Sequence, residues 1–404
     1  MRNLWMVVGF IVLLIAAAIL YAGLAPVPPD LPTGQPQPDT HELEKCTPKV
    51  SAATAVTQTI TVAAGEKIQD AVDRANPGDT ILVSPGVYNQ SVLVSTKNIT
   101  LRGMGEDAGR PVLDGGNSIE NGVDVCGDHF TIENIVVRNY KGNGVLAQNV
   151  DGVTFRNVMT DHTGDYGLFP VNSKNILIDH CVATGAADTG LYVGQSENII
   201  VRDNEAFANV SGIEIENSSN ALVERNYSHD NTDGLLVFLL PDLSRKETTD
   251  NIIRNNRFIA NNLANFGDPA DIVAKVPAGT GMLIMGADRT EVTGNEIRDN
   301  RSVGIATVGL RTLFDTRKDF DVGTEPEGNW VHDNVLQNNG TNPTPEALRF
   351  GLPAADLVWD GSGWDNAWHE SVKSTFPPVL PDRGWSDFAR RFYWRVLGVA
   401  RKFM

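Results

Sequence analysis

The chain has 404 residues, of which 50 are acidic and 33 are basic, and its formal net charge is -17. A surface this acidic repels nucleic acid, so we exclude nucleic-acid binding as its function. The hydrophobic fraction of 41% is that of a folded protein, and the length fits either a few ordinary domains or one long repeat array.

The amino-terminal segment Leu4–Ala25 contains 22 residues without a charge, enough to cross a bilayer. It is either a cleaved signal peptide or a retained anchor. Because Pro26 directly follows the small-residue candidate cleavage site, we expect retention. Arg2 precedes the segment, which favours a single-pass membrane protein with its bulk on the periplasmic or extracellular side. Residues 26–56 are rich in proline and suit a spacer.

The three cysteines, Cys46, Cys126 and Cys181, do not have the spacing of a metal site, and we predict no metal ligands among them. At least one thiol stays unpaired in any pairing scheme. Two interpretations remain open: all three are structural thiols, or one disulfide includes Cys46.

A repeat begins after the spacer. Segments such as NGVLA, TGLYV and DGLLV share a glycine, and most of these glycines lie 22 or 23 residues apart: Gly144, Gly167, Gly190, Gly212, Gly234, Gly281 and Gly304. Each unit has short β-branched strands separated by Asn, Asp and Gly turns, with no room for a long helix. A period in the twenties predicts stacked coils that close their apolar faces against one another.

Two solenoids have this period, a leucine-rich horseshoe and a parallel β-helix. The strands here are rich in Ile and Val and lack the LxxLxL pattern, which favours the β-helix. Asparagines recur where the first strand of each coil should turn, and we predict that they stack as a ladder, with His180 as a turn residue among them: Asn134, Asn157, Asn204, Asn226, Asn256 and Asn295.

Residues Ile60 to Asp114, with the run PGDTILVSPGVY, resemble the opening of right-handed parallel β-helix repeat proteins of the pectin-lyase-like superfamily. The resemblance extends to about Asn339. The run after Gly190 is most similar to a group of exported bacterial β-helix proteins, and this similarity implies no particular activity. It implies an all-β fold: a single-stranded right-handed parallel β-helix of 22–23-residue coils over residues 57–340. A short helix near Ile68–Ala75 would cap the first coil.

A candidate site follows from period-two alternation in the strand after each repeat glycine. Val145, Leu168, Leu191, Ile213 and Leu235 should point inward, whereas Leu146, Phe169, Tyr192, Glu214 and Leu236 should point outward. Because neighbouring coils stack about 4.8 Å apart, the outward side chains form one patch. Its candidate catalytic residues are Asp165, Asp188, Glu214 and Glu216, and its candidate substrate-binding residues are Tyr166, Phe169, Tyr192, His162 and His229.

Aromatic rings beside carboxylates suit a polysaccharide, with the acids binding hydroxyls or acting as acid and base. A hydrolase would use two carboxylates across the scissile bond. A uronate lyase or epimerase would need a base and a cation such as calcium. Alginate epimerases of this fold carry Asp-Pro-His after a Tyr-Gly strand, but here Tyr166-Gly167 continues as Leu168-Phe169-Pro170-Val171.

We therefore predict an envelope protein that binds a polysaccharide and cleaves or modifies it. Two other interpretations stay open. The acidic side chains could be ordinary solvated turn residues, with outward Leu146, Leu236 and Phe238 under a covering loop. Alternatively, the chain could be a non-enzymatic scaffold that holds a partner protein at the membrane.

Insertions interrupt the repeat at Leu240–Asn251, at Asn262–Gly279 and after Gly309, and could form a wall of the patch. Residues 341–385, rich in Trp and Pro, should form an irregular cap. Finally, residues 386–404 predict a basic amphipathic helix that attaches to a membrane surface, docks on a partner or packs on the coils, with one apolar stripe: Phe388, Phe392, Val396, Val399 and Phe403.

Overall fold

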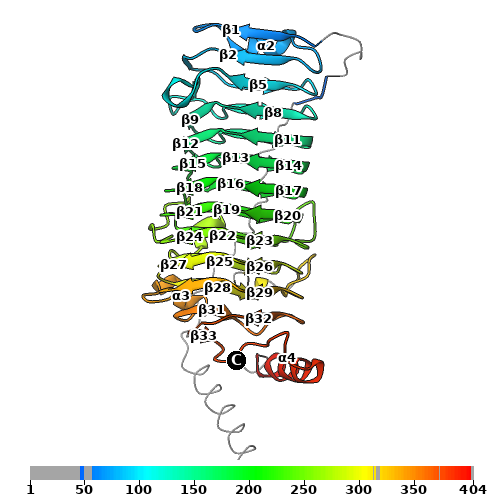
Figure 1. Cartoon of the computed structure of the whole chain (residues 1–404), viewed down its shortest axis with the longest axis vertical. Coiled ribbons are helices and arrows are strands. Elements are labelled where there is room, and N and C mark those ends of the chain that lie inside the picture. The colour runs from blue at the N-terminus through cyan, green and yellow to red at the C-terminus, as the bar shows by residue number, and fades with distance from the viewer. Residues whose placement is uncertain (1–45, 50–56, 313, 315–318, 373, 402–404) are drawn as a thin grey trace, which may run out of the picture.

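A computed structural model describes residues 46–49, 57–312, 314, 319–372 and 374–401 of the chain. Three parallel sheets run along one elongated stack of coils, the right-handed parallel β-helix predicted from the sequence (Figure 1). Each coil supplies one strand to each sheet in turn. We name the sheets by the number of strands that they have in the described residues.

The three sheets have the following strands. The 12-stranded sheet contains β1 (Thr59–Val62), β2 (Thr80–Val83), β5 (Thr100–Gly103), β8 (Phe130–Glu133), β11 (Asp151–Arg156), β14 (Lys174–Asp179), β17 (Glu197–Arg202), β20 (Ser219–Glu224), β23 (Ile252–Arg254), β26 (Glu291–Thr293), β29 (Trp330–His332) and β32 (Ala367–His369). The 10-stranded sheet contains β3 (Val87–Tyr88), β6 (Val112–Asp114), β9 (Val136–Tyr140), β12 (Met159–Thr163), β15 (Val182–Thr184), β18 (Glu205–Phe207), β21 (Tyr227–His229), β24 (Arg257–Ile259), β27 (Glu296–Arg298) and β30 (Val335–Gln337). The 11-stranded sheet contains β4 (Val92–Val94), β7 (Val123–Val125), β10 (Val145–Gln148), β13 (Leu168–Val171), β16 (Thr189–Gly194), β19 (Ser211–Glu216), β22 (Asp233–Phe238), β25 (Thr280–Met285), β28 (Val303–Val308), β31 (Ala355–Trp359) and β33 (Thr375–Phe376).

The repeat glycines lie where successive coils come closest. A Cβ atom at Gly144 would lie 2.5 Å from the carbonyl oxygen of Gly167, and one at Gly167 would lie 2.4 Å from that of Gly190. Real Cβ atoms do not approach a backbone oxygen this closely. The repeat therefore keeps glycine because a side chain would separate the coils.

The alternation predicted for the 11-stranded sheet is confirmed. Val145, Leu168 and Leu191 are register partners on consecutive strands, and all three are buried in the interior. Ile213 and Leu235 continue the same column. The interior of the solenoid is thus a continuous apolar column that each coil extends.

The predicted cap helix is α2 (Ile68–Arg74), which covers the first coils (Figure 1). Its Ile68, Ala71 and Val72 side chains are buried, as the amphipathic pattern requires. The helix prevents the apolar end of the column from meeting water.

Asparagine ladders do line the turns, but the predicted membership is partly wrong. Asn204, Asn226, Asn256 and Asn295 are buried and pass hydrogen bonds from coil to coil. Asn134 and Asn157 lie one position earlier in their coils, with φ of 61° and 50°. They belong to a column of left-handed turn residues that also holds His180, at φ 55°, so His180 is a turn residue as predicted. The pattern could not separate these columns because asparagine suits both positions.

A second asparagine ladder, absent from our prediction, follows five residues later in each coil. Its members donate to one another's side-chain oxygens in the same way: Asn209, Asn231, Asn261, Asn300 and Asn339. The signal was visible in the sequence as the spacing N-x4-N in NEAFAN, NYSHDN and NRFIAN. Two buried ladders per coil hold the turns that separate the sheets.

A disulfide joins Cys46 to Cys126, whereas Cys181 is a buried free thiol. The interpretation with a Cys46 bridge is therefore the one the structure shows. Burial raises the pKa of the Cys181 thiol to about 12, so this thiol should be inert in the folded chain.

Counting thiols tests this arrangement. Denatured but unreduced protein should react with a maleimide at one cysteine, Cys181, and reduced protein at all three. Mass spectrometry measures the added labels. Three labels without reductant would contradict the bridge.

The coils continue beyond residue 340, where we expected an irregular cap. Strand β31 pairs with β28, and β32 pairs with β29. A short helix, α3 (Pro345–Arg349), precedes them, and α4 (Asp387–Arg401) lies at the end of the stack (Figure 1). The repeat pattern did not reveal this coil because Trp and Pro replace many of the Ile and Val residues that mark the other coils.

Within the described residues, the helices are all too short or too polar to span a bilayer. The predicted membrane segment, Leu4–Ala25, lies outside these residues.

Candidate functional site

The structure brings most of the predicted site residues onto the outer face of the 11-stranded sheet. Leu146 pairs in register with Phe169, Tyr192 with Glu214, and Gly194 with Glu216. We call this region, from β13 to β22, the acidic-aromatic face. It is defined by Tyr166, Phe169, Tyr192, Asp188, Glu214, Glu216 and Asp233.

The aromatic half of this face is a tight cluster. The ring centroids of Tyr166 and Phe169 are 4.2 Å apart, and those of Phe169 and Tyr192 are 4.8 Å apart with an edge-to-face geometry. We expected exposed rings, but Tyr192 is only 1% exposed and the other rings are also buried. The rings are therefore closed to a ligand in this conformation.

The insertions explain the burial of outward side chains on strand β22 of the 11-stranded sheet. Leu236 and Phe238 pack with Leu240 and Val276 from two insertions, as the covering-loop interpretation predicts, whereas Leu146 packs in the aromatic cluster instead. Two further contacts extend the insertions toward the acidic-aromatic face. The Ser244 hydroxyl donates to the Asn172 side chain at 2.5 Å, and Asn217 donates to the backbone oxygens of Leu240 and Arg245. The insertions therefore border the face, as predicted.

The carboxyl half of the face lies on β19 and β22. Glu214 is 3% exposed, and burial, together with the nearby Asp233 and Glu216, raises its pKa well above the usual range. Burial raises the pKa of Asp233 to about 8, although the Ser211 hydroxyl donates to its Oδ1 at 2.9 Å. A pKa of about 8 keeps the Asp233 carboxyl group largely protonated near neutral pH, and the pKa of Glu214 is shifted in the same direction.

One oxygen of each carboxyl group lacks a hydrogen-bond partner among the described residues. Glu214 Oε1 and Asp233 Oδ2 are buried without a hydrogen-bond partner in the described part of the chain. Buried polar atoms usually have a partner, so such atoms mark a place where a ligand or a water would bind. A protonated carboxyl group can donate a proton to a sugar oxygen, which is the role of a general acid.

Asp233 was missed in the sequence. It directly precedes the repeat glycine Gly234, in register with Ser211. The residues that directly precede the repeat glycines form a polar column, which is visible in the aligned segments. The column contains Thr189, Ser211, Asp233 and Thr280. Our alternation began one residue after each glycine and therefore omitted this column.

The remaining predicted acids lie at the edge of the face. Asp165 and Asp188 occupy equivalent positions of consecutive coils. A hydrogen bond from the backbone N–H of Asp188 to the backbone oxygen of Asp165 joins them. The Thr189 hydroxyl donates to Asp188 Oδ1 at 2.9 Å. Glu216 accepts a hydrogen bond from Gln195 at 2.9 Å.

His162 and His229 do not join this face, contrary to our prediction. They lie within β12 and β21 of the 10-stranded sheet rather than in turns that lead into the face. His162 pairs with Asp161, and His229 pairs with Glu205 and stacks on Tyr227 with ring centroids 4.0 Å apart. In each coil the strand of the 10-stranded sheet comes before the strand of the 11-stranded sheet, so the two histidines lie on a neighbouring sheet.

One group of potential metal ligands is found among the described residues: Asp179, His180 and Asp203, with ligand atoms within 4.8 Å of one another. Asp179 accepts hydrogen bonds from Arg156 at 3.3 Å and from Arg202 at 3.1 Å. Desolvation raises the pKa of Asp179, but the hydrogen bonds from Arg202 and His180 outweigh it, and the net pKa is lowered. Arginines already neutralise these carboxylates, so the group does not suit a divalent cation.

Comparison with known proteins identifies a family. Residues 123–362, more than half of the chain, match the family described as "Periplasmic copper-binding protein (NosD)". The pre-neck appendage proteins of Bacillus phages phi29 and PZA are 28% and 27% identical over 170 residues. The match covers 40% of this chain and 18% of each phage protein.

Two solved structures share the fold. They are the A-modules of the Azotobacter vinelandii mannuronan C-5 epimerases AlgE4 and AlgE6, with TM-scores of 0.52 and 0.54. Their sequence identities are 15% and 14%, and the alignments cover 81% and 80% of this chain and 87% of each module. At such identities the likeness concerns the fold alone.

Proposed function

Because the chain belongs to the NosD family, we propose that it is an extracytoplasmic β-helix protein that binds a polysaccharide on its acidic-aromatic face and transfers protons to it there. The extracytoplasmic location is supported by the family's description as periplasmic and by the Cys46–Cys126 disulfide, since disulfides persist outside the cytoplasm. We further propose that Leu4–Ala25 holds the chain at the membrane.

The observation that carries the proposal is the buried carboxyl pair Glu214 and Asp233. The pKa of about 8 keeps a proton on Asp233 near neutral pH, the pKa of Glu214 is raised in the same direction, and each group has an oxygen without a partner among the described residues. Glu216, on the same strand as Glu214, is a third carboxyl group that could bind a hydroxyl. Rings of Tyr192 and Phe169 lie beside them and would pack against sugar faces once uncovered.

Copper, which the family's description names, does not fit the described residues. Copper sites use imidazole and sulfur ligands, but the group at Asp179 has one imidazole and two carboxylates already paired with arginines. Cys181 is buried in the apolar interior, where its thiol pKa is raised. The proposed function therefore includes no step at a copper ion.

Isosteric variants of the full chain can separate binding from chemistry. Glu214→Gln keeps the shape of the neutral acid but cannot give up a proton. It should keep polysaccharide binding and lose at least about 100-fold in any turnover, the usual worth of a general acid. Glu216→Gln should instead weaken binding by about tenfold, because it removes a hydrogen-bond-accepting charge.

Binding would be measured on a polysaccharide array that includes mannuronan, and turnover by analysis of the products. The matched control is Glu205→Gln, which lies on β18 of the 10-stranded sheet and should change neither quantity. If the folded chain bound none of these glycans, the proposal would be wrong.

A further inference from the structure

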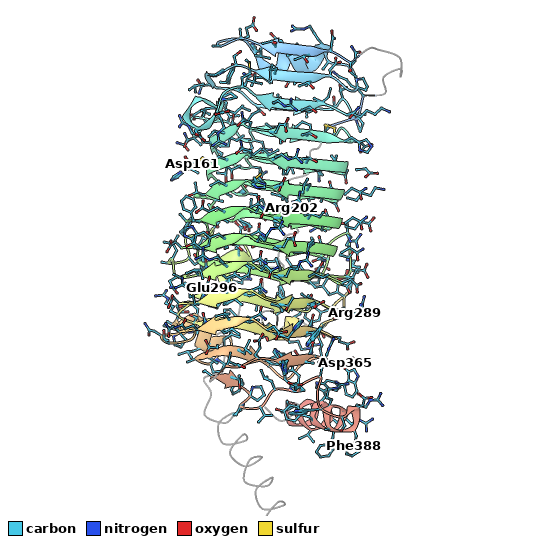
Figure 2. The ribbon with its side chains drawn as sticks, viewed as in Figure 1. Asp161, Arg202, Arg289, Glu296, Asp365 and Phe388 are labelled. Carbon is cyan, nitrogen blue, oxygen red and sulfur yellow. A yellow bond between two sulfur atoms is a disulfide. The ribbon has the colours of Figure 1, made fainter. Side chains whose placement is uncertain are left out.

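Helix α4 leaves an apolar stripe uncovered at the end of the β-helix. Phe388, Phe392 and Val396 are 79%, 59% and 40% exposed. They are four residues apart and so lie along one side of the helix. Figure 2 shows Phe388 on the outside of α4, at the end of the molecule. Exposed apolar side chains of this size, gathered on one element, indicate an interaction surface.

The opposite side of α4 already has its packing partners. Trp394 is buried against the last coil, and its ring lies 5.1 Å from that of Trp364. The Tyr393 ring lies 6.5 Å from that of Trp359, and its hydroxyl donates to the Val379 backbone oxygen. The helix therefore caps the coils through these residues, and the part of the predicted stripe formed by Phe388, Phe392 and Val396 is not the face that packs, while the side chains of Val399 and Phe403 lie outside the described ones.

Cationic side chains lie beside the stripe. At about 100° per residue, Arg391 and Arg395 fall next to Phe388 and Phe392 on the helix surface. Both arginines are exposed, and neither forms an ion pair with a described residue. Arg390, on the inner side, pairs with Asp387. An uncompensated cationic edge is unusual on a chain with a net charge of -17.

We propose that α4 docks the end of the β-helix on an anionic lipid surface. The phenylalanines would enter the interface between headgroups and acyl chains, and the two arginines would contact lipid phosphates. Lipid suits the stripe better than a protein partner does because Arg391 and Arg395, which form no ion pair with a described residue, lie beside it and complement an anionic surface. The inference stands apart from the polysaccharide site, which lies on other coils.

A fluorescent label on the stripe tests this docking in the full chain. A Phe392→Cys variant carries the only reactive cysteine, because Cys46 and Cys126 are bridged and Cys181 is buried. The variant is labelled with NBD and reconstituted into vesicles of phosphatidylcholine, with or without an equal part of phosphatidylglycerol. Spin-labelled lipids then report contact by quenching the label. The matched control is Val87→Cys, exposed on β3 near the other end of the solenoid.

With phosphatidylglycerol, the label at position 392 should be quenched and its emission should shift to the blue, while the label at position 87 should not change. Adding Arg391→Glu and Arg395→Glu should reduce the docked fraction more than about tenfold, since each arginine near an anionic surface contributes about fivefold. A label at position 392 that stays in water in both kinds of vesicle would overturn the proposal. Equal quenching at both positions would also overturn it, and neither result would alter glycan binding.

Discussion

Raising the pH from about 4 to about 7 should destabilise the folded chain by about 4 kcal/mol through Asp233 alone. Burial raises the pKa of Asp233 to about 8 in the folded chain, whereas an unfolded aspartate titrates near 3.8. The folded state therefore binds the proton more tightly than the unfolded state. The resulting stability is fully present below about pH 4 and is lost as the pH rises toward 8. Glu214, whose pKa is also raised, should add to the same slope.

An Asp233→Asn variant should flatten this dependence. The amide keeps an oxygen to accept the hydrogen bond from Ser211 but has no proton to lose. The free energy of unfolding would be measured in urea with tryptophan fluorescence at each pH. Asp230→Asn, which neutralises an exposed carboxylate three residues away, is the matched control. Equal slopes for the wild type and Asp233→Asn would show that Asp233 titrates normally.

Replacing Asn226 by alanine should lower the free energy of unfolding by about 3–5 kcal/mol. Its side chain accepts from the backbone and side-chain nitrogens of Asn204 and donates to the Val201 oxygen and to the Asn256 side chain. The site is buried, so water cannot replace these bonds. Each buried group left unpaired costs about 1–3 kcal/mol, and neighbouring losses are only partly additive.

Asn157→Gly is the matched control for this ladder. Asn157 is exposed and has a left-handed φ of 50° that glycine tolerates. Its side chain donates one hydrogen bond to Asn134 and accepts a longer one, of 3.4 Å, from Arg110. We expect it to cost less than about 1 kcal/mol. Urea unfolding of the two variants gives the comparison, and similar losses would mean that the ladder does not stabilise the coils.

The sequence determined the fold because the fold is periodic. Each glycine marks the close approach of two coils, and each Ile, Val or Leu that follows extends one interior column, so Gly144 and Val145 predict the surroundings of Gly167 and Leu168. The same regularity placed Tyr192 beside Glu214 correctly. Where the residues of the repeat change, as at the coil of β31 and β32, the prediction failed.

Only the tertiary structure decided which of these side chains meet water. Alternation states that Tyr192, Glu214 and Leu236 point out of the coil, but it does not state that all three are buried, or that insertion residues Leu240 and Val276 pack with Leu236. Asp233 lies near Glu214 from the position before the repeat glycine, which an alternation that begins after each glycine does not include. The helical pattern of α4 likewise predicted its apolar stripe, yet the packing of Trp394 on the last coil decided that the stripe faces outward. Periodicity sets which residues are neighbours, whereas burial and pKa depend on contacts between segments distant in the sequence.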